Sequence, residues 1–448
     1  MSLLHESKLS LKLAIPLMIG QLSQMLMGVV DTLMVGHLGV SELAALTFAN
    51  SLFYVPFVFG IGVLTAVSVL SSNARGAMDS REARASCREG LYLGVGLGLL
   101  LFLICGLISL RLDWFGQPEE VTAATGTFYR IIMFSTVPAL GSIALKNHAD
   151  ALNRAWTPFW IFLGGVLLNV LLNWMLIFGK LGCPELGFEG AAWATLIARV
   201  AILLAVLAWL MGSKDLKEWV PHRWFVRMKF NSMRKLLRLG VPASLQMLSE
   251  VSAFSAAGII MGLIGTEAMA AHQITISMTG TAFMIPLGFS MALTVRVGEA
   301  YGAQDPPRLR DIAYSGWLVL IGSAAITASC FLFLGDTMAA WFTDEAPLVE
   351  LTASLLAICA AFQFFDAQQV GSASMLRGMH DTRVPAIVAF ISYWIIGIPA
   401  GCLLAFGCDM GARGIWWGLA IGLAMAAITL GWRMRVMMKH LASSPTRA

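Results

Sequence analysis

Long apolar runs alternate with short polar segments along most of the chain. A membrane-crossing helix needs about 20 mainly apolar residues. Twelve segments meet this requirement, and they predict transmembrane helices at residues 12–36, 44–72, 90–110, 126–148, 158–179, 190–211, 236–264, 268–295, 312–334, 349–375, 384–406 and 413–433. An even number of crossings places both ends of the chain on one side of the membrane.

The composition supports a polytopic helical membrane protein. Charged residues make up 12% of the chain and hydrophobic residues 58%, whereas soluble domains carry about 25% charged residues. The net charge of +4 is explained by basic loops at a membrane surface, so no nucleic-acid partner is expected. The seven cysteines are scattered without a CxxC pair, which supports neither a zinc site nor a disulfide framework.

Basic residues are strongly biased to one set of loops. The opposite loops hold Arg111, Lys180 and Arg413, with Arg130 near that side, whereas the remaining clusters of Lys and Arg fall on the other side. The positive-inside rule then predicts that both termini are cytoplasmic.

The two halves of the chain repeat each other. AIPLMIGQLSQM at 14–25 resembles GVPASLQMLSEV at 240–251, and RGAMD at 75–79 resembles YGAQD at 301–305. Six spans repeated in the same orientation form a parallel repeat, which in many transporters flanks a central pathway and supports alternating access. We therefore expect six-helix bundles at 1–212 and 234–448. The basic, amphipathic linker loop at 213–233 is expected to lie on the anionic inner leaflet.

Asp31 lies in an apolar span, where an ionised carboxylate costs at least ~2.5–3.5 kcal/mol. Gln21, Gln24, Gly28 and Asp31 have spacings that place them on one helical face. That face is expected to line the bundle interior or a wet cavity.

Polar partners for Asp31 occur in later spans. Asn169 and Asn173 are four residues apart in the fifth span, and Thr195 lies in the sixth. Together with Asp31 they offer an oxygen site for a monovalent cation such as Na⁺, or a hydrogen-bonding cage for a proton-binding carboxyl group. The alternative is a structural polar cluster, since Asn and Thr also join membrane helices.

In the second half of the chain, the acidic residues within spans do not occupy the repeat position of Asp31. Glu250 and Asp366 lie in the seventh and tenth spans, and Gln24, not Asp31, occupies the repeat position of Glu250. Gln363 shares a stripe with Asp366. Asp366 and Arg377 are about 16 Å apart along a helix, so a direct ion pair between them is not expected.

The cavity wall is expected to be soft and aromatic, because Met adapts to varied shapes and aromatic faces attract cations. The candidates for this wall are Met247, Phe254, Met278, Phe283 and Met284; ordinary helix packing or lipid contact is the alternative for each. His37 and His272, near outer span ends, are expected to be surface or packing histidines.

These motifs together resemble the multidrug and toxic compound extrusion (MATE) family in its bacterial NorM-type branch. The resemblance covers nearly the whole chain and is carried by VDTLMVGHLG at 30–39, FFDAQQVGSASMLRG at 364–378, and the six-plus-six repeat. It implies twelve helices in two bundles related by a pseudo-two-fold axis, V-shaped around a central cavity.

The resemblance also implies roles for residues. Asp31, Asn169, Asn173 and Thr195 match the amino-terminal cation site of the family. Glu250 and Asp366 match acids that the DinF-type branch lacks, and Phe283 matches an aromatic residue lining that second site. One departure is Phe362, which stands where a tyrosine is expected.

The resemblance therefore implies a secondary active multidrug efflux antiporter that exports organic cations in exchange for inward Na⁺ or H⁺. Asp31 is the expected main coupling acid, with Glu250 and Asp366 as a second ion or substrate site. We expect a monomer in the bacterial inner membrane, surrounded by lipids, without a cofactor.

Other interpretations remain open. The main alternative is an exporter or flippase of a native metabolite or lipid-linked cargo, although such a cargo favours a basic cavity. A membrane enzyme is disfavoured because HESKL at 5–9 does not match HExxH and no GxSxG occurs. A channel is disfavoured because no filter repeat is present.

Overall fold

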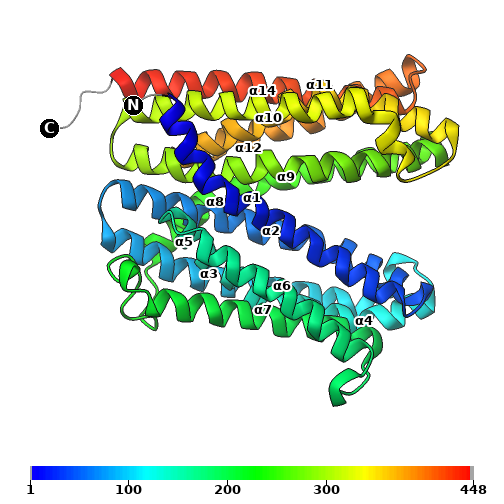
Figure 1. Cartoon of the computed structure of the whole chain (residues 1–448), viewed down its shortest axis with the longest axis horizontal. Coiled ribbons are helices and arrows are strands. Elements are labelled where there is room, and N and C mark those ends of the chain that lie inside the picture. Colours follow the sequence, from blue (N-terminus) through cyan, green and yellow to red (C-terminus); the bar gives the residue numbers. More distant parts are fainter. Residues whose placement is uncertain (1–2, 444–448) are drawn as a thin grey trace. The chain divides into compact units, whose positions relative to one another are not determined.

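The computed structural model describes residues 3–443, and within that range every regular element is helical (Figure 1). The elements are α1 (Leu3–Gly36), α2 (Val40–Gly76), α3 (Ser80–Ile108), η1 (Ser109–Phe115), α4 (Glu119–Phe134), α5 (Thr136–Ala151), α6 (Trp156–Ile177), η2 (Lys180–Gly182), α7 (Gly187–Gly212), η3 (Lys214–Leu216), α8 (Phe230–Ile264), α9 (Thr266–Gly302), α10 (Pro306–Ala340), α11 (Ala346–Gly378), α12 (Arg383–Phe390), η4 (Ile391–Gly397), α13 (Ile398–Cys402), η5 (Leu403–Gly407) and α14 (Ala412–Ser443).

The predicted number of spans is confirmed for the described residues, where twelve helical stretches are long and apolar enough to cross a membrane. Several are longer than predicted, because polar turns extend the helices beyond their apolar centres. Asp79 caps α3 by accepting a hydrogen bond from the Glu82 backbone N–H, and Asp305 caps α10 through the N–H of Arg308, each at 3.0 Å. The two caps occupy matching positions of the repeat.

The chain forms two compact units, and α1 and α8 are each divided between them. Ile19–Ser244 form the first unit; the second consists of Leu245 onwards with the residues through Met18. This division differs from the expected one, which placed the start of α1 in the first bundle. Hydropathy marks the length of a helix, but it does not show which neighbours each half of that helix contacts.

Close backbone contacts hold the divided helices to their units. In the first unit, a Cβ on Gly62 of α2 would lie 2.6 Å from the Ser244 Cα of α8. In the second unit, a Cβ on Gly288 of α9 would lie 2.6 Å from the Met18 Cα of α1. Glycine allows both approaches, and the paired positions again match in the repeat.

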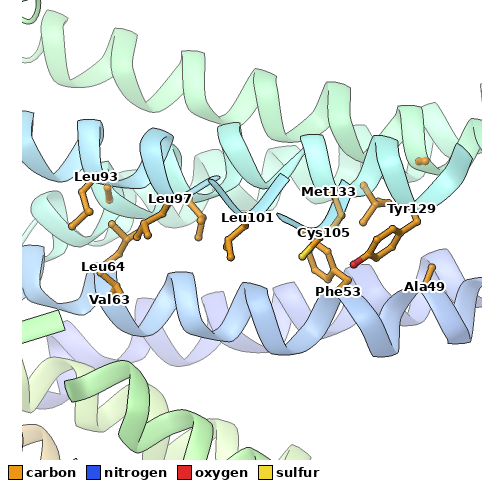
Figure 2. Packing of buried hydrophobic residues seen from close by; sticks show 14 of the residues in the cluster. Ala49, Phe53, Val63, Leu64, Leu93, Leu97, Leu101, Cys105, Tyr129 and Met133 are labelled. Atoms are coloured by element: carbon orange, nitrogen blue, oxygen red, sulfur yellow. The ribbon is translucent and has the colours of Figure 1, made fainter. Parts of the chain in front are cut away.

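The first unit has an apolar core between α2, α3 and α4. Figure 2 shows Leu64 of α2, Leu97 of α3 and Tyr129 of α4 pointing into it. Leu64 and Tyr129 are at most 1% exposed. This packing fixes the helices that surround the end of α1.

The eleventh span, Arg383–Gly407, is irregular and packs closely on α14. Wide π-helical turns occur at η4 and η5. A Cβ on Gly418 of α14 would lie 2.2 Å from the backbone of Gly401. Such turns often occur at functional sites, and η4 carries Tyr393 beside the acids of the second unit.

Candidate functional site

In the first unit, the structure brings the four predicted polar residues into one hydrogen-bonded chain. Asn173 Nδ2 donates to Asp31 Oδ1 at 2.6 Å and to Asn169 Oδ1 at 3.3 Å. Asn169 Nδ2 donates to Thr195 Oγ1 at 3.2 Å, and the Thr195 hydroxyl donates to the Ala191 carbonyl. The chain links the last turns of α1 to α6 and α7.

One hydrogen-bond acceptor in this site, the side-chain oxygen of Asn173, has no donor. Asn169 and Asn173 are 0% exposed, and Asn173 Oδ1 is buried without a hydrogen-bond partner. Buried acceptors are normally bonded, because leaving one unpaired costs free energy. The Asn173 and Thr195 oxygens and the partly exposed Asp31 carboxylate are the hard ligands that a monovalent cation prefers.

Among residues 3–443, no group of three or more His, Cys, Asp or Glu side chains could hold a metal ion. The donor set near Asp31 is mainly neutral and fits one added positive charge, either a monovalent ion bound by the oxygens or a proton on the carboxylate.

Arg199 belongs to this site, although sequence reasoning gave it no role. It lies one turn after Thr195 on α7, and its charge attracts that of Asp31. Its guanidinium donates to Ser135 Oγ at 2.6 Å and lies 5.3 Å from the ring centroids of both Phe53 and Phe57. The sequence signals were its spacing from Thr195 and its charge inside the span predicted at 190–211.

In the second unit, Glu250 of α8 interacts with two other charged residues, Asp366 and Arg377. The Tyr393 hydroxyl donates to Glu250 Oε1 at 3.4 Å. Asp366 of α11, which is 5% exposed, repels the charge of Glu250, whereas Arg377 attracts it. Arg377 thus acts on Glu250, consistent with the expectation that it does not pair directly with Asp366.

Tyr393 supplies a hydroxyl that sequence reasoning expected at position 362. Phe362 instead packs against Phe254 and Trp416, with ring centroids 6.0 Å from each. Phe254 lies one turn after Glu250 on α8 and also faces the Tyr393 ring, 6.3 Å away. Aromatic side chains therefore lie one turn from each acid, Phe254 after Glu250 and Phe362 before Asp366.

The remaining candidates are more dispersed. Met278 and Gln363 are buried, with Met278 in the apolar core of the second unit. Met247, Phe283 and Met284 are partly exposed and Gln24 is exposed, so their place in a cavity wall stays a prediction.

The two histidines differ in environment. His37 is exposed and bonds the Leu33 carbonyl at 2.7 Å, as expected of a surface residue. His272 is buried, with its ring centroid 5.5 Å from that of Trp416, as expected of a packing residue.

Known proteins resemble the chain along almost its whole length. Probable multidrug resistance protein NorM of Agrobacterium fabrum is 35% identical over 438 residues, covering 97% of this chain and 94% of that protein. The protein of the same name from Bradyrhizobium diazoefficiens is 36% identical over 450 residues, covering 96% and 94%.

A solved multidrug resistance MATE family transporter in an outward-facing conformation shares the fold. It is 22% identical, with a TM-score of 0.89 and coverage of 98% of this chain and 97% of that one. The MatE family model matches twice, at residues 16–175 and 242–403, so each half of the repeat is recognised separately. The chain, a multi-pass membrane protein, therefore belongs to the MatE family, and the expected resemblance is confirmed.

Proposed function

We propose that this protein is a secondary active multidrug efflux antiporter that exports organic cations in exchange for inward Na⁺ or H⁺ by alternating access. The observation that carries the proposal is the Asp31 carboxylate, held by Asn173 beside an unpartnered amide oxygen inside a transmembrane bundle. The names of the NorM relatives support multidrug efflux as the activity.

The exchange follows from the charge of Asp31. When ionised, the carboxylate attracts a cationic drug; when neutralised by H⁺ or paired with Na⁺, it releases that drug. A low-dielectric environment favours the neutral state of a carboxyl group, so the bound charge can change near neutral pH. The membrane potential adds ~2.3 kcal/mol per 100 mV for each entering charge.

The second-unit acids supply a second ion or drug site in this proposal. Asp366 and Glu250 lie among aromatic rings, and Tyr393 bonds Glu250. We place the transporter in the bacterial inner membrane, with both termini cytoplasmic and each chain working as a monomer.

One feature favours the alternative of a native metabolite or lipid-linked cargo. Arg199 and Arg377 each place a positive charge beside an acid site, and such charges would attract a phosphate-bearing molecule. The Arg199 guanidinium is held between two phenyl rings and a hydrogen bond to Ser135. We therefore assign it the role of setting how strongly Asp31 attracts a cation.

Ethidium efflux from inverted membrane vesicles tests the proposal, with a Na⁺ gradient and a pH gradient imposed separately. We expect one gradient to drive ethidium transport at a rate above that of vesicles lacking the protein. That gradient identifies the coupling ion. If neither gradient moves ethidium or another organic cation, the cationic cargo is wrong and the metabolite or lipid cargo takes its place.

Arg199→Gln is expected to strengthen the apparent affinity for the coupling cation about fivefold. Removing a nearby positive charge leaves the ionised Asp31 more attractive to a cation, and a fivefold gain in affinity corresponds to about 1 kcal/mol. The measurement is efflux rate against Na⁺ or H⁺ concentration.

Two variants control this prediction. Arg199→Lys keeps the charge and should retain the wild-type affinity, whereas Arg130→Gln removes an exposed arginine of α4 and should change nothing. If Arg199→Gln leaves the cation dependence unaltered while lowering thermal stability, Arg199 is a structural residue that holds Ser135.

A further inference from the structure

The segment at residues 213–229 joins the end of α7 to the start of α8 (Figure 1), and both helices are long and apolar enough to cross a membrane. Its first part is packed into the first unit. Leu216 and Val220 are buried against an apolar cluster of α5 and α7, and His148 Nε2 bonds the Trp219 carbonyl at 3.1 Å. This part is therefore not free to lie on a membrane.

The second part, HRWFVRMKF at 222–230, is held mainly through its backbone. The Tyr92 hydroxyl donates to the Trp224 carbonyl and accepts from the Val226 N–H at 3.3 Å. The Lys229 N–H donates to Glu89 Oε1 at 3.2 Å. These contacts fix the path of the chain. The Trp224 side chain packs against the same apolar cluster, whereas the side chains of residues 225–230 are exposed.

Large apolar side chains on this part are exposed. Phe225 is 99% exposed, Phe230 75% and Met228 55%. Exposed apolar groups gathered in this way mark a surface that contacts another phase or partner.

Along this stretch of the chain the charged side chains have a single sign, although Lys235 pairs with Glu82 of α3 at 2.6 Å. From Glu218 to Glu250 the chain contains no other acid, and within that stretch it carries Arg223, Arg227, Lys229, Arg234, Lys235 and Arg238. All six are exposed. Bases alternate with apolar residues in the exposed part, which is the arrangement that binds anionic bilayer surfaces: the bases meet phosphates and the apolar tips enter the acyl boundary.

We propose that Arg223, Phe225, Arg227, Met228, Lys229 and Phe230, here called the linker surface, bind the anionic phospholipid headgroups of the adjacent leaflet. The basic side chains alone would bind any anion. The three exposed apolar side chains also need a hydrophobic phase, and an anionic lipid supplies both the charge and that phase. Because α8 begins at Phe230, bound lipid would fix the start of the helix that passes from the first unit to the second.

The test uses the full-length protein in neutral detergent micelles containing dansyl phosphatidylglycerol or dansyl phosphatidylcholine. Energy transfer from the protein's tryptophans reports lipid binding. Each base near a bilayer surface contributes about a fivefold gain in affinity. The Arg223→Gln/Arg227→Gln/Lys229→Gln variant should therefore bind phosphatidylglycerol roughly 100-fold more weakly, and high salt should reduce wild-type binding in the same direction.

A Lys8→Gln/Arg435→Gln/Lys439→Gln variant is the matched control, since it removes three other exposed bases; it should keep most of the affinity. Phe225→Ser/Phe230→Ser should weaken binding of both lipids. Equal affinity for the two lipids, or equal losses in the two charge variants, would overturn the proposal. Full competition by soluble glycerophosphoglycerol or by an acidic peptide would also overturn it, in favour of an anion or protein site.

Discussion

Asp31→Asn is expected to reduce gradient-driven ethidium efflux to the level of vesicles lacking the protein. The amide keeps the size of the side chain and can still bond Asn173, but it carries no charge for a cation to neutralise. Two unit charges 4 Å apart attract by about 4 kcal/mol at an effective dielectric constant of 20, so cation affinity at the site falls roughly 100- to 1000-fold.

The control for this variant is Asp113→Asn, which removes an exposed carboxylate of η1 in the same unit and should pump normally. Asp31→Glu should retain partial activity, because the charge remains but is displaced by one methylene group. Size-exclusion profiles of all three variants check folding. Normal pumping by Asp31→Asn would show that Glu250 and Asp366 carry the coupling.

Gly418→Val is expected to prevent folding of the second unit. The missing Cβ of Gly418 would lie 2.2 Å from the Gly401 backbone and 2.6 Å from the Gly397 carbonyl oxygen, and backbone atoms cannot rotate aside. Ordinary overpacking costs about 1–3 kcal/mol, and separating two helices whose backbones touch should cost more. The expected result is loss of the monodisperse size-exclusion peak.

Gly418→Ala should fold less stably, with a lower thermal midpoint. Gly431→Val is the matched control, because Gly431 lies on the same helix and a Cβ added there would meet no heavy atom within 4 Å. A monodisperse, thermally stable Gly418→Val protein would show that α14 and the eleventh span do not pack through these glycines.

The number of spans and the repeat were predictable because each depends on local pattern. Hydropathy identified twelve spans, and the matching loops at 75–79 and 301–305 end in Asp79 and Asp305, which cap equivalent helices. The division of α1 and α8 was not predictable. It depends on which helix each half touches, and the glycines at positions 62 and 288 look alike in sequence to many that make no contact.

Some residues of the candidate sites were predictable from the sequence and others were not. Asp31, Asn169, Asn173 and Thr195 could be grouped because an acid in an apolar span needs polar partners, and the spacing of the two asparagines offered them on one face. Sequence reasoning missed one residue in each unit. Arg199 acts on Asp31, and Tyr393 reaches Glu250 from an irregular turn that hydropathy does not reveal.

In the proposed exchange, drug and coupling cation exclude each other at Asp31, and equilibrium competition on the purified protein would detect this exclusion. Bound ethidium would be followed by fluorescence polarisation while Na⁺ or H⁺ is raised, with choline keeping the ionic strength constant. We expect one cation to displace ethidium from the wild-type protein, and we expect Asp31→Asn to lose this displacement. Ethidium binding that neither cation alters would show that drug and cation do not compete at Asp31.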